Sequence, residues 1–207
     1  MNASVRYPLA LAAVVLLFVL SGCGKKEKSA QEYNTSTAAV TKDDNASAVS
    51  SKPSPAKDNR FMLTDHNGIS HTVVMKKEKL LFPDIAKPVV ILHFFSTWSD
   101  PCQGEAPYLS DLQLKYKKKI AILGILLHPD NYLEELDTFV SKNKLAYFIS
   151  SGGENDAFAK AISKRLSLPD MLPIPLTVIY HNGRYYKHYE GAVPVEMLVH
   201  DINTLLK

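Results

Sequence analysis

Continuous apolar runs and Asn-Gly dipeptides divide the chain beyond residue 60 into strands and turns. Val89–Leu92 is an unbroken apolar run, which is typical of a strand covered on both faces of a sheet. Asn67-Gly68 and Asn182-Gly183 are strong signals for two-residue hairpin turns, the first of which would place His66 opposite Ile69. We therefore expect strands over residues 61–63, 69–74, 88–95, 120–127, 176–180 and 184–189.

Between these strands, apolar residues recur at helical spacing. Leu109, Leu112 and Tyr116 would share one face of a helix over residues 101–118. Further helices are expected over residues 131–143, 156–166 and 195–206. Two buried strands joined through a helix form a parallel βαβ unit, to which the late hairpin adds antiparallel strands. The predicted fold class is α/β, with a mixed central sheet flanked by helices and an added N-terminal β-hairpin.

The first 22 residues have the order of a secretory signal peptide: a positive start at Arg6, then apolar residues over Leu9–Leu20. The apolar stretch is shorter than the roughly 20 residues that cross a bilayer. Leu20–Cys23 reads Leu-Ser-Gly-Cys and resembles the lipobox of bacterial lipoproteins. This resemblance implies that Cys23 becomes a lipidated N-terminus, the alternative being a plain signal peptide with an incidental cysteine.

Residues 23–59 are rich in Ser, Ala, Lys, Asp and Thr and carry few large apolar side chains. Such a segment cannot bury enough apolar surface to offset the entropy of ordering, so we expect a disordered, lipid-anchored tether. Residues 60–207 would then form one domain held at a membrane on the extracytoplasmic, periplasmic side of a bacterial envelope, where thiols meet oxidising conditions.

The overall composition narrows the function classes. Of 207 residues, 46% are hydrophobic and 22% charged, and the formal net charge is only +3. Lys115 and Lys117–Lys119 form the densest basic run at the expected end of a helix, where cations complement the helix dipole. Nucleic-acid binding therefore has no support. The seven histidines show no close ligand spacing, so we expect no metal site, and nothing points to a cofactor.

The segment over residues 94–107, Phe-Phe-Ser-Thr-Trp-Ser-Asp-Pro-Cys-Gln-Gly-Glu-Ala-Pro, carries the most specific signal. It resembles the active-site segment of membrane-anchored thioredoxin-like proteins of the TlpA, ResA and DsbE type. Their pattern is an apolar strand, Trp-Cys-x-Pro-Cys, and a helix with Glu and Pro. Pro173–Thr177 resembles the family's cis-proline loop, and the N-terminal hairpin and Glu190-Gly191 also match. The resemblance covers about residues 60–207 and implies a thioredoxin-like fold and thiol–disulfide exchange with protein partners, apocytochrome c among them.

The chain departs from this pattern at one position, since Ser99 stands where the family has its first cysteine. In a dithiol motif that sulfur is ionised at a helix N-terminus and attacks the substrate disulfide. A serine hydroxyl is too weak an acid to ionise there and forms no exchangeable disulfide. Serine is, however, a good N-cap residue, worth about 1 kcal/mol over alanine. The change is expected to remove the attacking group and keep the helix start.

The remaining motif residues have two interpretations each. Cys102 is one helical turn after Ser99 and is either a slow, partly buried thiol, with Asp100 opposing its ionisation, or a working nucleophile. Glu105 matches a family glutamate that assists proton movement at the second cysteine, the alternative being a solvated helix residue. Trp98 is either a substrate-facing aromatic or a packing residue. By the resemblance, Pro175 is cis, and Pro101, Ile174, Pro175 and Trp98 would contact an extended substrate.

Three hypotheses for the function remain open at this point. The chain is a degenerate member of the thiol–disulfide family that still uses Cys102 or a partner's cysteine. Alternatively, it is a non-enzymatic binder of unfolded or cysteine-containing segments at the cis-proline groove. In the third, Ser99 is an engineered or mistaken residue in an ordinary dithiol reductase, which re-reading codon 99 would reveal.

Overall fold

The computed structural model describes residues 59–128 and 133–207. The expected signal peptide, the expected lipidation site Cys23 and nearly all of the expected tether lie outside these residues. Among the residues that the structure describes, no helix is both long enough and apolar enough to span a membrane.

A five-stranded mixed sheet forms the centre of the domain, as predicted. Its order is β6-β5-β4-β7-β8. The two central strands β4 and β5 are parallel and β6 is parallel to β5, whereas β7 and β8 run antiparallel to their neighbours. The bounds are β4 Val89–Phe95, β5 Ile120–Leu126, β6 Phe148–Ser150, β7 Leu176–His181 and β8 Arg184–Glu190. Every residue of β4 is buried, which explains why its sequence is apolar except at His93.

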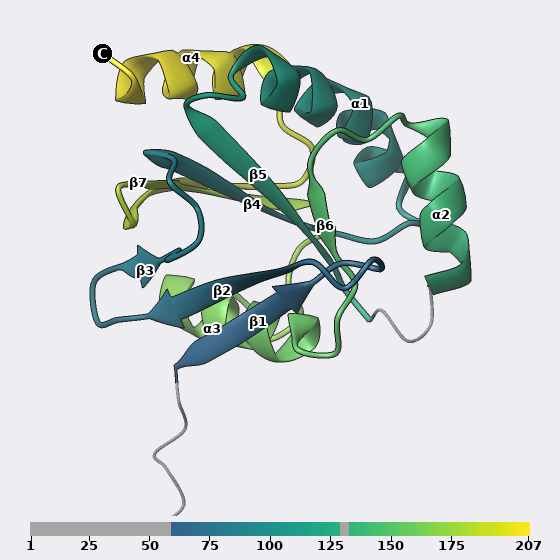
Figure 1. Cartoon of the computed structure of the whole chain (residues 1–207), viewed down its shortest axis with the longest axis horizontal. Helices are drawn as coiled ribbons and strands as arrows, with labels where there is room; N and C mark the ends of the chain where they lie inside the picture. Colours follow the sequence, from purple (N-terminus) through teal and green to yellow (C-terminus); the bar gives the residue numbers. More distant parts are fainter. Residues whose placement is uncertain (1–58, 129–132) are drawn as a thin grey trace, which may run out of the picture. The chain divides into compact units, whose positions relative to one another are not determined.

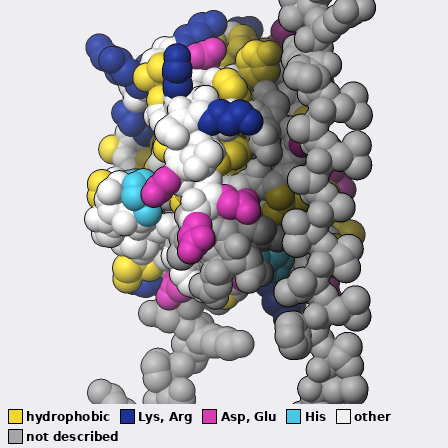
Figure 2. Space-filling view, turned by 90° about the vertical axis from the view of Figure 1, so that its right-hand side faces the viewer, with side chains coloured by type: hydrophobic (Ala, Val, Ile, Leu, Met, Phe, Trp, Pro, Cys, Tyr) yellow, Lys and Arg dark blue, Asp and Glu magenta, His cyan; other side chains and the backbone are white. Residues whose placement is uncertain are grey.

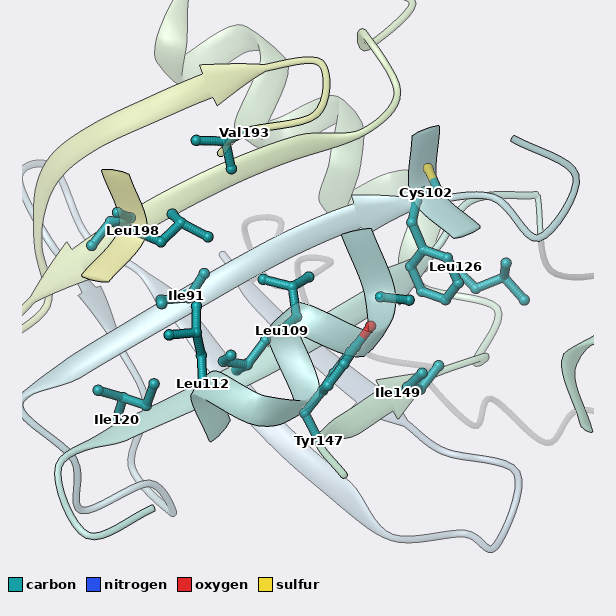
Figure 3. Packing of buried hydrophobic residues seen from close by; sticks show 14 of the residues in the cluster. Ile91, Cys102, Leu109, Leu112, Ile120, Leu126, Tyr147, Ile149, Val193 and Leu198 are labelled. Carbon is teal, nitrogen blue, oxygen red and sulfur yellow. The ribbon is translucent and has the colours of Figure 1, made fainter. Parts of the chain in front are cut away.

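Helices and a small second sheet cover the two faces of this sheet (Figure 1). One apolar core lies between the sheet and the helices α1 (Asp100–Lys115), α2 (Leu133–Lys142) and α4 (Val195–Leu205). The other core lies against α3 (Asn155–Leu166) and an antiparallel sheet of β1 (Arg60–Thr64), β2 (Ser70–Met75) and β3 (Leu80–Leu81). The first core holds Cys102 and is drawn in Figure 3.

The two Asn-Gly dipeptides form different turns, and the prediction for the first was wrong. At Asn182-Gly183 both residues have positive φ and His181 pairs with Arg184, as expected of a two-residue turn. In the first hairpin the Asp65 backbone N–H instead donates to Ile69, so three residues form the loop. The Asp65 carboxylate causes this, since it accepts from the backbone N–H groups of Asn67 and Ile69 at 2.9 and 2.8 Å.

Element ends also differ from the predictions in places. The first long helix ends at Lys115, with Tyr116 as its C-cap, rather than at residue 118. Lys117–Lys119 therefore lie in the turn before β5, where the Lys119 backbone N–H donates to the Tyr116 carbonyl at 2.7 Å. The short strands β3 and β6 were not predicted, because two or three residues carry no periodic signal. The expected start of the second helix, at residue 131, lies outside the described residues.

Charged side chains do not gather into one large surface of a single sign on the face drawn in Figure 2. There, Lys and Arg lie mainly toward one end and Asp and Glu toward the other, among apolar and uncharged groups. Within the described part of this face, no continuous basic surface is present that would suit a nucleic acid.

Candidate functional site

The loop after β4 and the start of α1 carry the motif, and Ser99 is the N-cap residue, as predicted. The loop is held by Gln103, whose side chain donates to the Thr97 carbonyl at 3.0 Å, and by Thr97, whose hydroxyl donates to Glu135 of α2 at 3.0 Å. The Ser99 side chain makes no capping hydrogen bond, so that part of the prediction was wrong. Its hydroxyl instead acts on the Cys102 thiol and lowers the pKa of that thiol.

Cys102 lies behind Ser99 on the buried face of α1. Its side chain is 0% exposed, and it forms no disulfide among the described residues. Burial raises the pKa of the Cys102 thiol, and the negative charge of Glu105 raises it further, while the Ser99 hydroxyl and the Ser96 backbone offset part of the increase. The opposing charge is thus that of Glu105 and not, as we expected, that of Asp100. This environment disfavours the thiolate, which is the reactive form of cysteine.

Glu105 is not a solvated helix residue, because only 6% of it is exposed. Neither carboxyl oxygen has a hydrogen-bond partner within the described residues. Burial raises the pKa of Glu105 from 4.5 to about 7, and the nearby Val193 backbone offsets part of this shift. The side chain also lines a cavity of about 510 Å³ between α1 and the loop before α4, together with Pro101 and Val193. Glu105 can therefore change its protonation state near neutral pH.

Tyr147, just before β6, is a member of this buried cluster that the sequence analysis missed. Its hydroxyl is buried without a hydrogen-bond partner in the described structure. The pKa of Tyr147 is raised by burial first and then by the charges of Glu105 and Cys102. Gly124 of β5 leaves room for the ring, because a Cβ there would lie 3.1 Å from its Cε2 atom. A glycine inside an apolar strand was the only available signal.

The cis-proline loop lies at the same end of the sheet as the motif, because Phe94 of β4 pairs with Leu176 of β7. The peptide bond between Ile174 and Pro175 is cis, and the Pro175 carbonyl accepts from the Gly191 backbone N–H at 2.8 Å. Ile174 is half-buried and lines an apolar cavity of about 450 Å³ beside α3. The register therefore brings together residues about 75 positions apart in sequence, from Ser99 to Ile174.

Two further motif residues are exposed beside this loop. Trp98 is 57% exposed, so its ring is not a core packing residue, and Pro101 is exposed at the first turn of α1. Whether they and Ile174 contact a substrate stays a prediction. In the described part of the chain, no three side chains of His, Cys, Asp or Glu gather as a metal site would require.

Comparison with known proteins assigns the chain to a family. The sequence model of the Redoxin family matches residues 84–206, which include the motif, Tyr147 and the cis-proline loop. The chain belongs to the redoxin family. Within it, the relatives and structural neighbours support the thioredoxin-like TlpA, ResA and DsbE group. The residue at position 99 is the feature that the family match does not explain.

Two proteins named thiol-disulfide oxidoreductase ResA illustrate the relationship of this redoxin to its relatives. The chain is 37% identical to ResA of Oceanobacillus iheyensis over 60 residues, which span 26% of this chain and 31% of that protein. With ResA of Bacillus subtilis it shares 26% identity over 149 residues, 71% of this chain and 72% of that protein. The chain therefore spans about a third of the first relative and under three quarters of the second.

Solved structures share the redoxin fold with this chain. A Chlorobium tepidum protein described as the thiol:disulfide interchange protein DsbE has a TM-score of 0.53 at 18% identity, over 72% of this chain and 95% of that one. StoA from Bacillus subtilis has a TM-score of 0.50 at 18% identity, over 74% of this chain and all of that one. At this level of identity the likeness supports the thioredoxin-like fold and not a shared activity.

Proposed function

We propose that this redoxin is an extracytoplasmic lipoprotein that binds cysteine-containing or extended segments of other proteins and cannot complete a dithiol cycle alone. The observation that carries the proposal is the position of Ser99, whose hydroxyl occupies the helix start in front of a completely buried Cys102. The family match supports protein thiols as the partner class.

A dithiol cycle needs two sulfurs in succession. The first attacks a substrate disulfide, and the second then displaces the substrate by forming an internal disulfide. Here oxygen occupies the first position, and the remaining thiol is buried with a raised pKa. An incoming disulfide would have to reach a sulfur with no exposed surface, and no second cysteine within the described residues could release the product.

Binding makes smaller demands on the site. The exposed ring of Trp98 and the half-buried Ile174 beside cis-Pro175 offer apolar surface next to the motif. An extended segment could add its backbone to this loop, a mode in which main-chain hydrogen bonds supply affinity and side-chain contacts supply selectivity. The adjoining apolar cavity beside α3 would accept one side chain of such a segment.

The decisive experiment measures insulin reduction by the full chain with dithiothreitol as the electron source. We expect a rate no higher than that of dithiothreitol alone. Ser99→Cys should form a reversible disulfide with Cys102, because residues three apart at a helix start lie close together, and should raise the rate at least tenfold. Steady turnover by the unaltered chain would refute the proposal.

The matched control is the double variant Ser99→Cys/Cys102→Ser, which has one thiol at the helix start and no internal partner. When it is mixed with a substrate disulfide in the absence of dithiothreitol, its thiolate should displace one substrate thiolate and the mixed disulfide should accumulate, because no internal thiol can resolve it. A second candidate function, a thiol-linked partner exchange through Cys102 itself, is tested by capture of a cysteine-containing peptide. Equal capture by Cys102→Ser supports binding alone, whereas loss of capture supports the thiol-linked function.

Anchoring through Cys23 is part of the proposal and rests on the Leu-Ser-Gly-Cys sequence. Cys23→Ala should release the chain from the membrane fraction of a bacterial host and abolish incorporation of labelled fatty acid. Unchanged membrane association and labelling would contradict the lipoprotein assignment.

A further inference from the structure

Three unpartnered polar groups are buried together beneath the start of α1, and two of them belong to Glu105 and Tyr147. Buried polar groups in folded proteins are nearly always hydrogen-bonded, so each exception calls for a partner such as a neighbouring group or an ordered water. Both oxygens of Glu105 and the Tyr147 hydroxyl lack partners, as does the Ser96 hydroxyl in the loop before α1. Ser96 and Glu105 both belong to the motif segment, whereas Tyr147 comes from the opposite side of α1.

The backbone places the Tyr147 hydroxyl at the level of Glu105. The neighbouring residue Ala146 donates its backbone N–H to the Ser110 hydroxyl of α1 at 3.2 Å. Ser110 is five residues after Glu105, which is rather more than one helical turn of about 5.4 Å. Tyr147 is therefore held against α1 close to the turn that carries Glu105, and Figure 3 shows its hydroxyl directed into the buried core that also holds Cys102.

The ring cannot easily turn elsewhere. Gly124 lies against it on β5, and a Cβ at that position would also lie 3.3 Å from Phe95. Tyr147 shares its apolar core with Cys102 and Phe95. Its hydroxyl is thus kept among apolar side chains, and the charges that act on it are those of the Glu105 carboxyl and the Cys102 thiol, both from α1.

We infer that Tyr147 is a positioning residue of the motif: its hydroxyl donates to the Glu105 carboxyl through one buried water, and thereby sets the charge next to Cys102. A neutral donor stabilises the ionised carboxylate relative to the protonated form. Tyr147 stays a donor throughout the neutral range, since burial and its two neighbours disfavour its own ionisation. The inference deepens the proposed function, because it concerns the protonation of the same motif, but its test needs no binding partner.

The test measures the titration midpoint of Glu105 by carbon-13 NMR of labelled glutamate in the full chain, in detergent. Tyr147→Phe keeps the ring and removes the hydroxyl. We expect the Glu105 midpoint to rise by about one pH unit, a tenfold gain in proton affinity. The pH dependence of the rate of Cys102 alkylation should differ between Tyr147→Phe and the unaltered chain. In the Glu105→Gln background, adding Tyr147→Phe should leave that pH dependence unchanged.

Tyr180→Phe is the matched control. Tyr180 is also buried with an unpartnered hydroxyl, but it packs in the core on the other side of the sheet. It should leave the Glu105 midpoint where it was. An unmoved midpoint in Tyr147→Phe, or an equal shift in both variants, would overturn the inference. Neither result bears on insulin reduction, so failure here is separate from failure of the proposed function.

The unaltered chain provides a second measurement that does not depend on Tyr147→Phe folding. The Cζ resonance of carbon-13 labelled Tyr147 should show a step at the Glu105 midpoint, near pH 7, and Glu105→Gln should remove that step. A Cζ resonance that is flat through this range would also overturn the inference.

Discussion

Two buried carboxyl groups lie against the same face of the central sheet, and their surroundings are opposite. Asp201 of α4 is 1% exposed and accepts hydrogen bonds from the Lys187 ammonium at 3.1 Å, from Tyr186 at 3.3 Å and from Tyr189. Glu105 of α1 is 6% exposed and has no hydrogen-bond partner within the described residues. Three hydrogen-bond donors therefore surround the Asp201 carboxylate, whereas the buried Glu105 carboxyl has no hydrogen-bond donor among the described residues.

This difference indicates that Asp201 stabilises the fold, whereas Glu105 can exchange a proton beside the motif. Asp201 ties α4 to β8, since its donors all lie on that strand, and its charge is fully satisfied there. Glu105 destabilises the fold whenever it is ionised, because desolvation favours the neutral form. Unsatisfied buried titratable groups concentrate at functional sites, and Glu105 lies beside the motif, whereas Asp201 does not.

Removal of Asp201 should have the largest effect on stability. Asp201→Ala leaves Lys187, Tyr186 and Tyr189 without their acceptor, and we expect the free energy of unfolding to fall by about 3–5 kcal/mol. Urea denaturation of the full chain measures this change. Asp111→Ala, which alters an exposed carboxylate of α1, is the control and should change stability little. A similar small loss in both variants would show that Asp201 does not tie α4 to β8.

Glu105→Gln should have an effect of opposite sign that depends on pH. Between the ordinary pKa of 4.5 and the folded-state pKa of about 7, the folded chain holds a proton that the unfolded chain has released. Stability of the unaltered chain therefore falls as pH rises through this window and levels off above it. The glutamine variant lacks this loss, so its stability relative to the unaltered chain should grow by about 3 kcal/mol from pH 4 to pH 8.

Glu196→Gln provides the control for this pH dependence. Glu196 lines the same cavity from α4 but is exposed, so its variant should follow the unaltered chain at every pH. Urea denaturation midpoints of the variants and the unaltered chain, measured at pH 4 and pH 8, test this prediction. A pH-independent difference for Glu105→Gln would mean that Glu105 is not buried in solution.

Lys187→Met should have the smallest effect and tests which donor matters at Asp201. The Asp201 carboxylate raises the pKa of Lys187, but 43% of the lysine side chain is exposed and solvent screens the pair. Methionine keeps the apolar stem of the side chain. We expect a loss below about 1 kcal/mol in the same urea assay, with the two tyrosine hydroxyls still satisfying the carboxylate. A loss equal to that of Asp201→Ala would assign the stabilisation to the ion pair instead.

The central fold could be predicted from the sequence because its signals are local. The apolar run over Val89–Leu92 indicated a strand buried on both faces, and every residue of β4 is buried. Helical spacing located α1 and α4 to within a few residues of their ends. The turn at Asn67-Gly68 was assigned wrongly, although its cause is also local, because Asp65 was not considered as an acceptor for the loop.

The sequence by itself determined the order of the main strands and helices along the chain, the helix start at Ser99 and the missing sulfur, since these depend on residue types and short-range spacing. Only the tertiary structure decided that Glu105 is buried, that Asp201 is partnered and that Tyr147 lies in the core that holds Cys102. Solvation and hydrogen bonding of a side chain are set by the groups packed around it. For Glu105 those groups come from segments some forty to ninety residues further along the chain, at Tyr147 and Val193.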